Sequence, residues 1–278
     1  MGVVLNVDVW PELREPVMVV ALTGWVDAGL AGTGAVAALA EQMGSAKRFG
    51  SIDIADLCDL QQTRPTVRLD DGVTSELIFP SVDFVAGTAG RDVVLVAGPE
   101  PSIRWRSFTA TIVEAANRLG VRTAVCLGGM PAPVSHRRPV SVMATASSRS
   151  VAQEVGDLRG DYVGPTGAQT VLQFALGEAG IRAIGLWAQV PHYVGGTPSP
   201  AAIRAVLERL RDLTGIEVDL RSLDEQADLY LEKVEEGLSE YPDVVEMIRQ
   251  LDEAIGPVPL PSGDELAREI EKFLREEP

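Results

Sequence analysis

The sequence predicts an α/β protein built on a central, mainly parallel sheet with helices on both faces. Along about the first 220 residues, short apolar and β-branched runs alternate with segments of helical spacing, such as SFTATIVEAANRLG (107–120). Because strands joined through a helix pair in parallel, this alternation indicates a mainly parallel sheet. The runs that predict strands are MVVAL (18–22), DVVLVAG (92–98), TAVCLGG (123–129) and IRAIGLWAQV (181–190).

The segment between Arg48 and Ala86 departs from this alternation. Its runs FGSIDIA, TVRL, VTSELIFP and VDFVA lack helical spacing. We expect them to form extra, antiparallel strands that are inserted after the first helix.

The C-terminal part of the chain differs from the rest in charge. Residues 221–278 carry 17 acidic and 6 basic side chains, which is −11 of the total charge of −16. Apolar residues at three- and four-residue spacing predict two amphipathic helices that are separated by Tyr241-Pro242. A proline-rich linker and the cap Ser262 predict a third helix. We therefore expect an α/β domain (1–220) and an acidic helical extension (221–278), which either covers the domain or binds a partner.

Composition narrows the classes of function. The excess of 40 acidic over 24 basic residues repels nucleic acid and anionic membranes, so we expect neither as a partner. No run approaches the ~20 apolar residues that a membrane-spanning helix needs, and acidic residues interrupt the N-terminal region before a signal peptide can form. Cys58 and Cys126 suggest neither a disulfide framework nor a thiolate metal site. We expect a cytoplasmic protein with no metal and no other cofactor.

The stretch ALTGWVDAGLAGTG (21–34) raises the question of a nucleotide site. Gly32 and Gly34 match a loose dinucleotide fingerprint, and Asp53 follows at about the distance of the ribose-binding acid. However, the predicted strand ends near Leu22, so Gly32 falls where a helix should already be under way. Gly24 takes the turn position, and we interpret Gly32 and Gly34 as small residues that allow close helix packing. A P-loop motif is absent from the sequence.

Residues for catalysis are few. The sequence has two histidines, His136 and His192, and neither has metal-binding spacing. Ser135 adjoins His136, but adjacent residues rarely form a nucleophile and its base, and there is no G-x-S-x-G elbow. No catalytic residue is assigned.

Four loops fall at the carboxyl ends of the predicted strands, where open α/β sheets bind ligands. They are TGWVDAG (23–29), GPEPSIRWR (98–106), GGMPAPVSHRRP (128–139) and VPHYVGG (190–196), and GPTG (164–167) adds a possible anion site ahead of a helix. If the loops form one pocket, we expect Arg104, Arg106 and His136 to converge with the Gly24–Gly29 turn on an anionic or polar ligand. The alternative is that each has only a structural role. The candidate ligand or interface residues are Gly24, Trp25, Asp27, Gly29, Glu100, Arg104, Arg106, His136, Arg137, Arg138, Gly164, Thr166, Gly167, His192 and Tyr193.

The motifs TGWVDAG, GPEPSIRW, LGGMPAPVSHRRP, GPTG and VPHYV, in this order, resemble the proteasome assembly chaperone family of the second type, particularly its bacterial members. The resemblance covers roughly residues 15–255. It implies a three-layer α/β fold similar to the phosphorylase and peptidyl hydrolase group, without phosphorylase catalytic residues. It also implies a role like that of eukaryotic and archaeal relatives, which escort proteasome α-subunits into rings and dock through a C-terminal hydrophobic-tyrosine-any motif. This chain ends Leu274-Arg275-Glu276-Glu277-Pro278 and lacks that motif.

Three hypotheses of function follow. The first is a non-enzymatic protein-interaction or assembly factor whose client is unknown. The second is a small-molecule enzyme of the phosphorylase or hydrolase-like group, and the third is an anion- or nucleotide-binding module without turnover. The resemblance also implies self-association, with a trimer as the preferred assembly.

Overall fold

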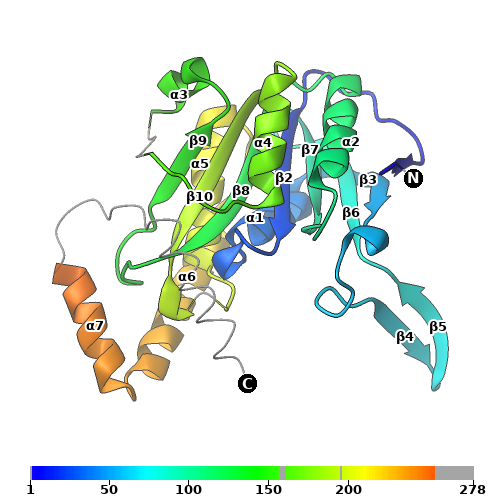
Figure 1. Cartoon of the computed structure of the whole chain (residues 1–278). Coiled ribbons are helices and arrows are strands. Elements are labelled where there is room, and N and C mark those ends of the chain that lie inside the picture. Colours follow the sequence, from blue (N-terminus) through cyan, green and yellow to red (C-terminus); the bar gives the residue numbers. More distant parts are fainter. Residues whose placement is uncertain (1, 157–160, 195, 254–278) are drawn as a thin grey trace.

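A computed structural model describes residues 2–156, 161–194 and 196–253. Eight strands of the described residues form one sheet, in the order β1-β3-β6-β7-β2-β8-β10-β9 (Figure 1). The strands are β1 (Leu5–Val7), β2 (Val17–Thr23), β3 (Gly44–Asp53), β6 (Ser81–Thr88), β7 (Asp92–Pro99), β8 (Thr123–Ala132), β9 (Val142–Ala146) and β10 (Arg182–Pro191).

The four strands predicted from the alternating pattern are the centre of this sheet. β7, β2, β8 and β10 are adjacent and parallel. The flanking strands β1, β3, β6 and β9 pair antiparallel, so the parallel arrangement holds for the centre and the sheet as a whole is mixed. The short loop 89–91 between β6 and β7 explains part of this result, since a short connection can join only antiparallel neighbours.

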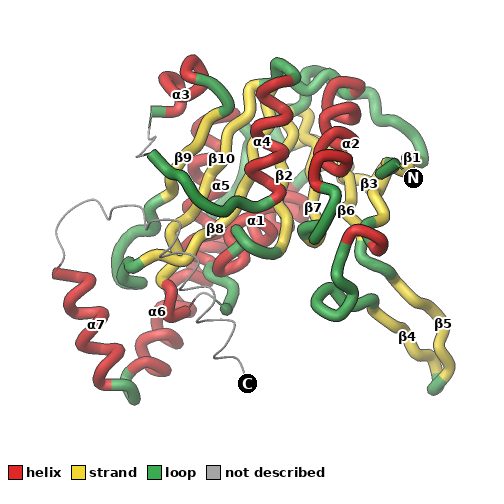
Figure 2. Tube along the Cα trace, in the orientation of Figure 1, coloured by secondary structure: helices red, strands yellow, loops and turns green. Residues whose placement is uncertain are grey.

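Helices cover both faces of the sheet (Figure 2). α1 (Ala31–Gln42) and α5 (Pro200–Thr214) pack on one face, and α2 (Trp105–Arg118) and α4 (Ala168–Glu178) pack on the other. The short helix α3 (Arg149–Val155) follows β9.

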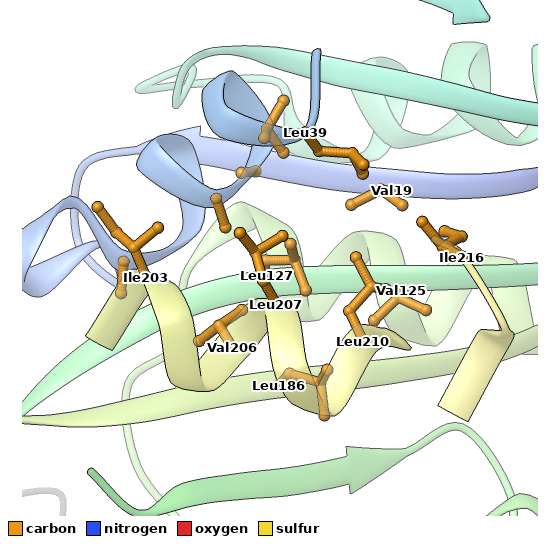
Figure 3. Close-up of a cluster of buried hydrophobic side chains, with 14 of the residues drawn as sticks. Val19, Leu39, Val125, Leu127, Leu186, Ile203, Val206, Leu207, Leu210 and Ile216 are labelled. Atoms are coloured by element: carbon orange, nitrogen blue, oxygen red, sulfur yellow. The ribbon is translucent and has the colours of Figure 1, made fainter. Parts of the chain in front are cut away.

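The central strand β2 is buried on both sides, which explains its continuous apolar sequence. Its side chains alternate between the two cores, with Val19 facing α1 and α5 and Met18 facing α2 and α4. Figure 3 shows the first core, in which Leu207 and Leu210 of α5 lie over the sheet beside Val125 and Leu127.

The segment after α1 adds antiparallel strands, as predicted. β3 and β6 extend the main sheet, whereas β4 (Thr66–Asp70) and β5 (Val73–Ile78) form a separate two-stranded hairpin. Figure 1 shows this hairpin projecting away from the main sheet and from the helices that cover it. The short 3₁₀ helix η2 (Ala55–Leu57) lies between β3 and the hairpin.

The two predicted helices after residue 220 are α6 (Arg221–Leu238) and α7 (Pro242–Glu253). Pro242 occupies the first position of α7, where the missing N–H costs no helical hydrogen bond. α6 packs against α5 and buries Leu223 in the core below. The third predicted helix, from Ser262, lies outside the described residues. Among the helices that the structure describes, none has the length and apolar character to cross a membrane.

Candidate functional site

The sheet has a topological switch point between β2 and β8. The two strands pair only from Val17 to Val20 of β2, although β2 continues to Thr23 and β8 to Ala132. α1, which follows β2, lies on one face, and α4, the helix that follows β8 and β9, covers the other. Open α/β sheets bind ligands where neighbouring strands part in this way, so this position is the first to inspect for a site.

The side chain of Gln169 fills the point where β2 and β8 separate. Gln169 is fully buried and belongs to the first turn of α4. Its Nε2 donates to the Leu127 carbonyl at 2.8 Å, and its Oε1 accepts a short hydrogen bond from the Leu22 N–H. One side chain therefore satisfies backbone groups of both strands where their own ladder stops.

The loop after β2 covers the end of β8 next to this glutamine. The Gly129 N–H donates to the Val26 carbonyl at 2.8 Å, and Asp27 forms a parallel bridge with Gly129. A Cβ at Gly128 would lie 2.3 Å from the Val26 oxygen, and one at Gly129 would lie 2.2 Å from the Ala28 oxygen. The two glycines of LGGM are therefore required by the close approach of this loop, and the chain itself occupies the ligand position of the sheet.

The side chain of Asp27 caps the N-terminal end of α1. Its carboxylate accepts hydrogen bonds from the N–H groups of Gly32 at 2.8 Å and Thr33 at 3.2 Å, and from the Thr33 hydroxyl. Asp27 is only 5% exposed, and this burial raises its pKa to about 6 against the lowering effect of these hydrogen bonds. The carboxylate occupies the first turn of α1, where a dinucleotide site would bind pyrophosphate.

The predicted roles of the glycines in this stretch are confirmed. Gly24 turns the chain after β2 with a φ of 137°. A Cβ at Gly32 would lie 2.3 Å from the Leu127 oxygen, and one at Gly34 would lie 2.5 Å from Ile203, so both allow close helix packing. Gly29 has a φ of 63° and lies against Val190 and Ser199.

Glu100 connects the turn after β2 with the start of α4. Its Oε2 accepts from the Trp25 N–H at 3.3 Å, and its Oε1 accepts a short hydrogen bond from the Ala168 N–H. A Cβ at either Gly24 or Gly167 would come within 2.9 Å of this carboxylate. The GPTG segment does place backbone N–H groups ahead of a helix, but the anion that they meet belongs to Glu100. Gly164 and Thr166 of the same segment are exposed.

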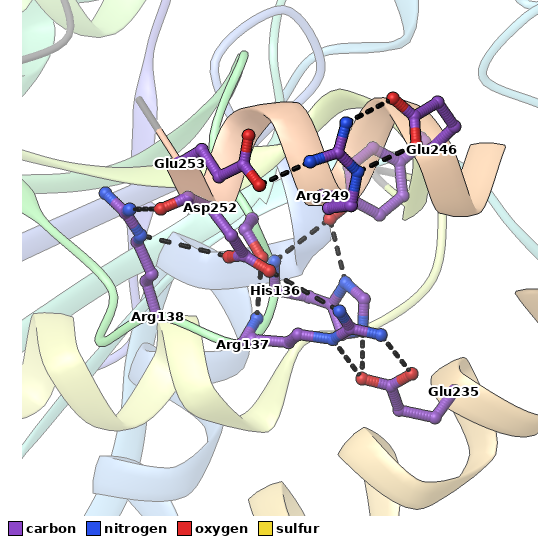
Figure 4. A network of polar contacts seen from close by, with 10 residues as sticks. His136, Arg137, Arg138, Glu235, Glu246, Arg249, Asp252 and Glu253 are labelled. Atoms are coloured by element: carbon purple, nitrogen blue, oxygen red, sulfur yellow. Dashed lines mark hydrogen bonds and ion pairs between the residues drawn. The ribbon is translucent and has the colours of Figure 1, made fainter. Parts of the chain in front are cut away.

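A second set of candidate residues meets the C-terminal extension (Figure 4). The side chain of His136 is 3% exposed, and its Nδ1 lies 2.8 Å from the Tyr193 hydroxyl while its Nε2 lies 3.1 Å from Glu235 of α6. Arg137 donates to both oxygens of Glu235, at 2.6 and 2.8 Å, and also contacts Asp252 of α7 at 3.4 Å.

The positive charge of Arg137 determines the pKa of its partner in this second set. Arg137 lowers the pKa of Glu235 to about 2, chiefly through their hydrogen bonds.

Arg138 reaches Asp252 through both a short hydrogen bond to its carbonyl and a 3.8 Å ion pair. His192 lies beside Tyr193, with ring centroids 5.4 Å apart, and its Nδ1 lies 3.3 Å from the Ala132 carbonyl oxygen. The basic part of the loop after β8 is thus bound to acidic residues of the extension.

The structure therefore groups the candidates into two sets. Glu100 joins Gly24, Trp25 and Gly167, whereas His136 and Arg137 join Tyr193 and the extension. Arg106 belongs to neither set, because it lines a groove between α2 and α4 on the outside of the molecule. Arg104 is exposed and precedes α2 in a left-handed conformation. The expected convergence of Arg104, Arg106 and His136 on one ligand remains a prediction.

Sequence reasoning missed the partners of these residues. Gln169 lies in a helical segment with no motif, and Glu235 and Asp252 are two of many acids in the extension. The only signal in the sequence was that the HRR triplet (136–138) and the extension carry opposite charges. This signal does not show which acidic residue pairs with which arginine. No group of three or more histidine, cysteine or acidic residues with metal-binding geometry occurs within residues 2–156, 161–194 and 196–253.

These features define an α/β protein whose strand-end ligand position is occupied by its own loops and whose basic strand-end loop is joined to an acidic helical extension. A model of the PAC2 family matches residues 21–238, and the chain belongs to this family. The resemblance to proteasome assembly chaperones that the sequence motifs indicated is thereby confirmed.

Solved structures agree with this assignment. The proteasome-assembly chaperone homologue Rv2125 of Mycobacterium tuberculosis is 39% identical, with a TM-score of 0.77 over 84% of this chain and 99% of that chain. A PAC2 family protein from Streptomyces avermitilis is also 39% identical, with a TM-score of 0.75 over 84% and 99%. Rv2714 of Mycobacterium tuberculosis, a protein of unknown function, is 26% identical, with a TM-score of 0.80 over 98% and 92%. No curated protein sequence matches the chain.

Proposed function

We propose that this protein is a non-enzymatic assembly factor that acts by binding other proteins. Membership of the PAC2 family and 39% identity to a proteasome-assembly chaperone homologue support a role in assembly. The name of that relative points to proteasome assembly, and the family resemblance makes proteasome α-subunits the first client to test.

The observation that carries the non-enzymatic part of the proposal is the filled switch point. Gln169 and the loop at residues 24–30 occupy the position where an α/β enzyme would bind a small molecule. The two helix N-termini nearby, which could bind an anion, are occupied by the carboxylates of Asp27 and Glu100. A small-molecule ligand would have to displace buried groups that already have hydrogen-bond partners, which is costly.

We further propose that the protein acts in the cytoplasm, that it forms homo-oligomers, with a trimer as the preferred assembly, and that nucleic acid is not a partner. The net charge of −16 supports the last point, because it opposes binding to a phosphate backbone. In this proposal residues 1–220 are the α/β domain, and residues 221–278 are the acidic extension.

The test is an assembly reaction followed by native mass spectrometry. Purified proteasome α-subunits are mixed with and without the full-length protein, and the formation of rings and of chaperone–subunit complexes is followed over time. We expect stoichiometric complexes with the subunits and faster ring formation. The absence of any such complex, together with a small molecule retained by the purified protein, would overturn the proposal in favour of an enzyme or a ligand-binding module.

A further inference from the structure

The hairpin β4–β5 presents an apolar face that nothing in the described part of the chain covers. Val67 and Leu77 are opposite each other across the two strands, and Leu69 lies two residues along on the same face. Their exposed fractions are 51%, 55% and 59%. Arg68 and Glu76 form a 2.8 Å ion pair on the other face. The face of Val67, Leu69 and Leu77 is therefore apolar, whereas the face of Arg68 and Glu76 is mixed, because it also carries Ile78 opposite Thr66 and Val73 opposite Asp70.

Such a hairpin gains little stability by itself. Two strands without a third strand or a helix are marginal in water, and within the described residues β4 and β5 pair only with each other. Every residue of both strands is exposed. An apolar face of this kind is typical of a surface that another protein covers.

The same molecule has an apolar groove on the outer side of α2 and α4. Val113, Val171 and Phe174 line it, and its volume is about 890 Å³. Phe174 is 67% exposed, although Gln169 and Gln173 of the same helix are buried. α4 buries Leu172 and Leu176 beside these two glutamines, which both have hydrogen-bond partners, and leaves a large aromatic side chain facing outward.

We propose that the hairpin of one copy docks, by its apolar face, into the α2/α4 groove of a second copy. This inference rests on the self-association proposed above and assigns its surfaces. The lengths are comparable, since a strand of five or six residues spans roughly 17–20 Å and the 14 residues of α2 span about 21 Å.

Charge complementarity gives the orientation. The tip of the hairpin carries Asp70 and Asp71, and Arg64 precedes β4 at its base. In the groove, Arg106 lies at the start of α2 and Glu178 at the end of α4. Both helices begin near Glu100, which precedes α2 and accepts the Ala168 N–H, so Arg106 and Glu178 mark opposite ends of the groove. The acidic tip therefore lies at Arg106 and the basic base at Glu178.

This contact is heterologous, because the hairpin and the groove are different surfaces of the same chain. Each copy can donate its hairpin to one neighbour and accept the hairpin of another. Contacts of this kind produce a ring when the rotation between neighbours closes.

The test uses two exposed apolar residues, one on each surface. Leu69→Glu alters the hairpin and Phe174→Glu alters the groove, and Leu229→Glu, which changes a leucine 58% exposed on α6, is the matched control. Light scattering and sedimentation give the mass of each full-length protein, and circular dichroism confirms that each is folded. We expect the wild type and the control to be oligomers, and each of the two test variants to dissociate with at least about a 30-fold higher dissociation constant.

Mixing the two test variants separates this contact from a symmetric one. The Leu69→Glu protein keeps its groove and the Phe174→Glu protein keeps its hairpin, so an equimolar mixture should give a 1:1 dimer. Charge exchange provides a second measurement, because Asp71→Arg should restore the assembly that Arg106→Glu weakens. An oligomer that persists in both single variants would overturn the hairpin–groove contact and leave self-association intact. A monomeric wild type would overturn both.

Discussion

Arg137 holds both carboxylate oxygens of Glu235, at 2.6 and 2.8 Å, and so joins the loop after β8 to a helix 98 residues further along the chain. The same guanidinium contacts Asp252 at 3.4 Å, so it connects α6 and α7 as well. The position of the extension relative to the strand ends therefore depends in part on one side chain.

Arg137→Gln should loosen the contact between the extension and the loop at residues 133–141. Both side chains are about 40% exposed, so screening by water limits the expected loss of unfolding free energy to about 1 kcal/mol. The loss should shrink at high salt, because exposed ion pairs are screened. Hydrogen exchange should accelerate in the loop and in α7, whereas Arg249→Gln, which breaks ion pairs within α7 only, should leave the loop unchanged. Equal protection of the loop in both variants would contradict a role of Arg137 in holding the extension.

The pH dependence of Asp27 gives a second prediction. Burial raises its pKa to about 6, so the folded protein binds a proton more tightly than the unfolded chain, whose reference value is 3.8. The stability from this group is fully present below pH 3.8 and is lost as the pH rises through about 6. The effect amounts to at most about 3 kcal/mol.

Denaturation at pH 5 and pH 8 measures this effect. Asp27→Asn removes the titration and retains an oxygen that can accept from Gly32, so the wild type should lose stability relative to the variant as the pH rises. The control for the loss of one charge is Asp53→Asn, because Asp53 also accepts a backbone hydrogen bond, from Ala55, but is exposed. A difference between wild type and Asp27→Asn that stays constant with pH would show that the buried carboxyl does not titrate in this range.

Two glycine-to-alanine substitutions should have opposite effects. A Cβ at Gly129 would lie 2.2 Å from the Ala28 oxygen, so Gly129→Ala should force the loop off β8 and destabilise the fold by about 3 kcal/mol or more. Gly237 lies in the last turn of α6, and apart from the backbone of this helix nothing comes within 4 Å of an added Cβ, so Gly237→Ala should stabilise by about 0.5–1 kcal/mol. Urea denaturation of both variants tests the close approach of the loop, and a stable Gly129→Ala protein would disprove it.

Gln169→Met should cost about 2–4 kcal/mol, because it leaves the Leu22 N–H and the Leu127 carbonyl buried without their partner. The same substitution at Gln226, which is exposed on α6, should change the unfolding free energy by less than about 0.5 kcal/mol. If the two substitutions are equally mild, Gln169 does not bridge the strands as described. In that case the switch point would be open to a ligand, which would favour an enzyme or a ligand-binding module.

The sequence predicted residues of the candidate site but not the groups that they contact. Strand-end position selected Asp27, Glu100, His136 and Arg137, because the carboxyl ends of parallel strands meet at one edge of a sheet. Gly167 was selected because GPTG precedes a helix. The sequence could not show that these charged side chains bind other groups of the same chain instead of a ligand. Asp27 and Glu100 bind backbone N–H groups of helices, and Arg137 binds the extension.

The sequence by itself determined the central strands, the helices α2, α6 and α7 and the packing role of Gly32, because apolar spacing and turn residues act over a few neighbouring positions. Only the tertiary structure decided the antiparallel pairing of β1 and β9 at the two edges, the separate hairpin and the pairing of Gln169 with Leu22, 147 residues apart in the chain. It also decided that Glu235, rather than another acid of the extension, meets Arg137. Such choices depend on which surfaces pack together and which buried polar groups then need partners, and no local pattern in the sequence encodes them.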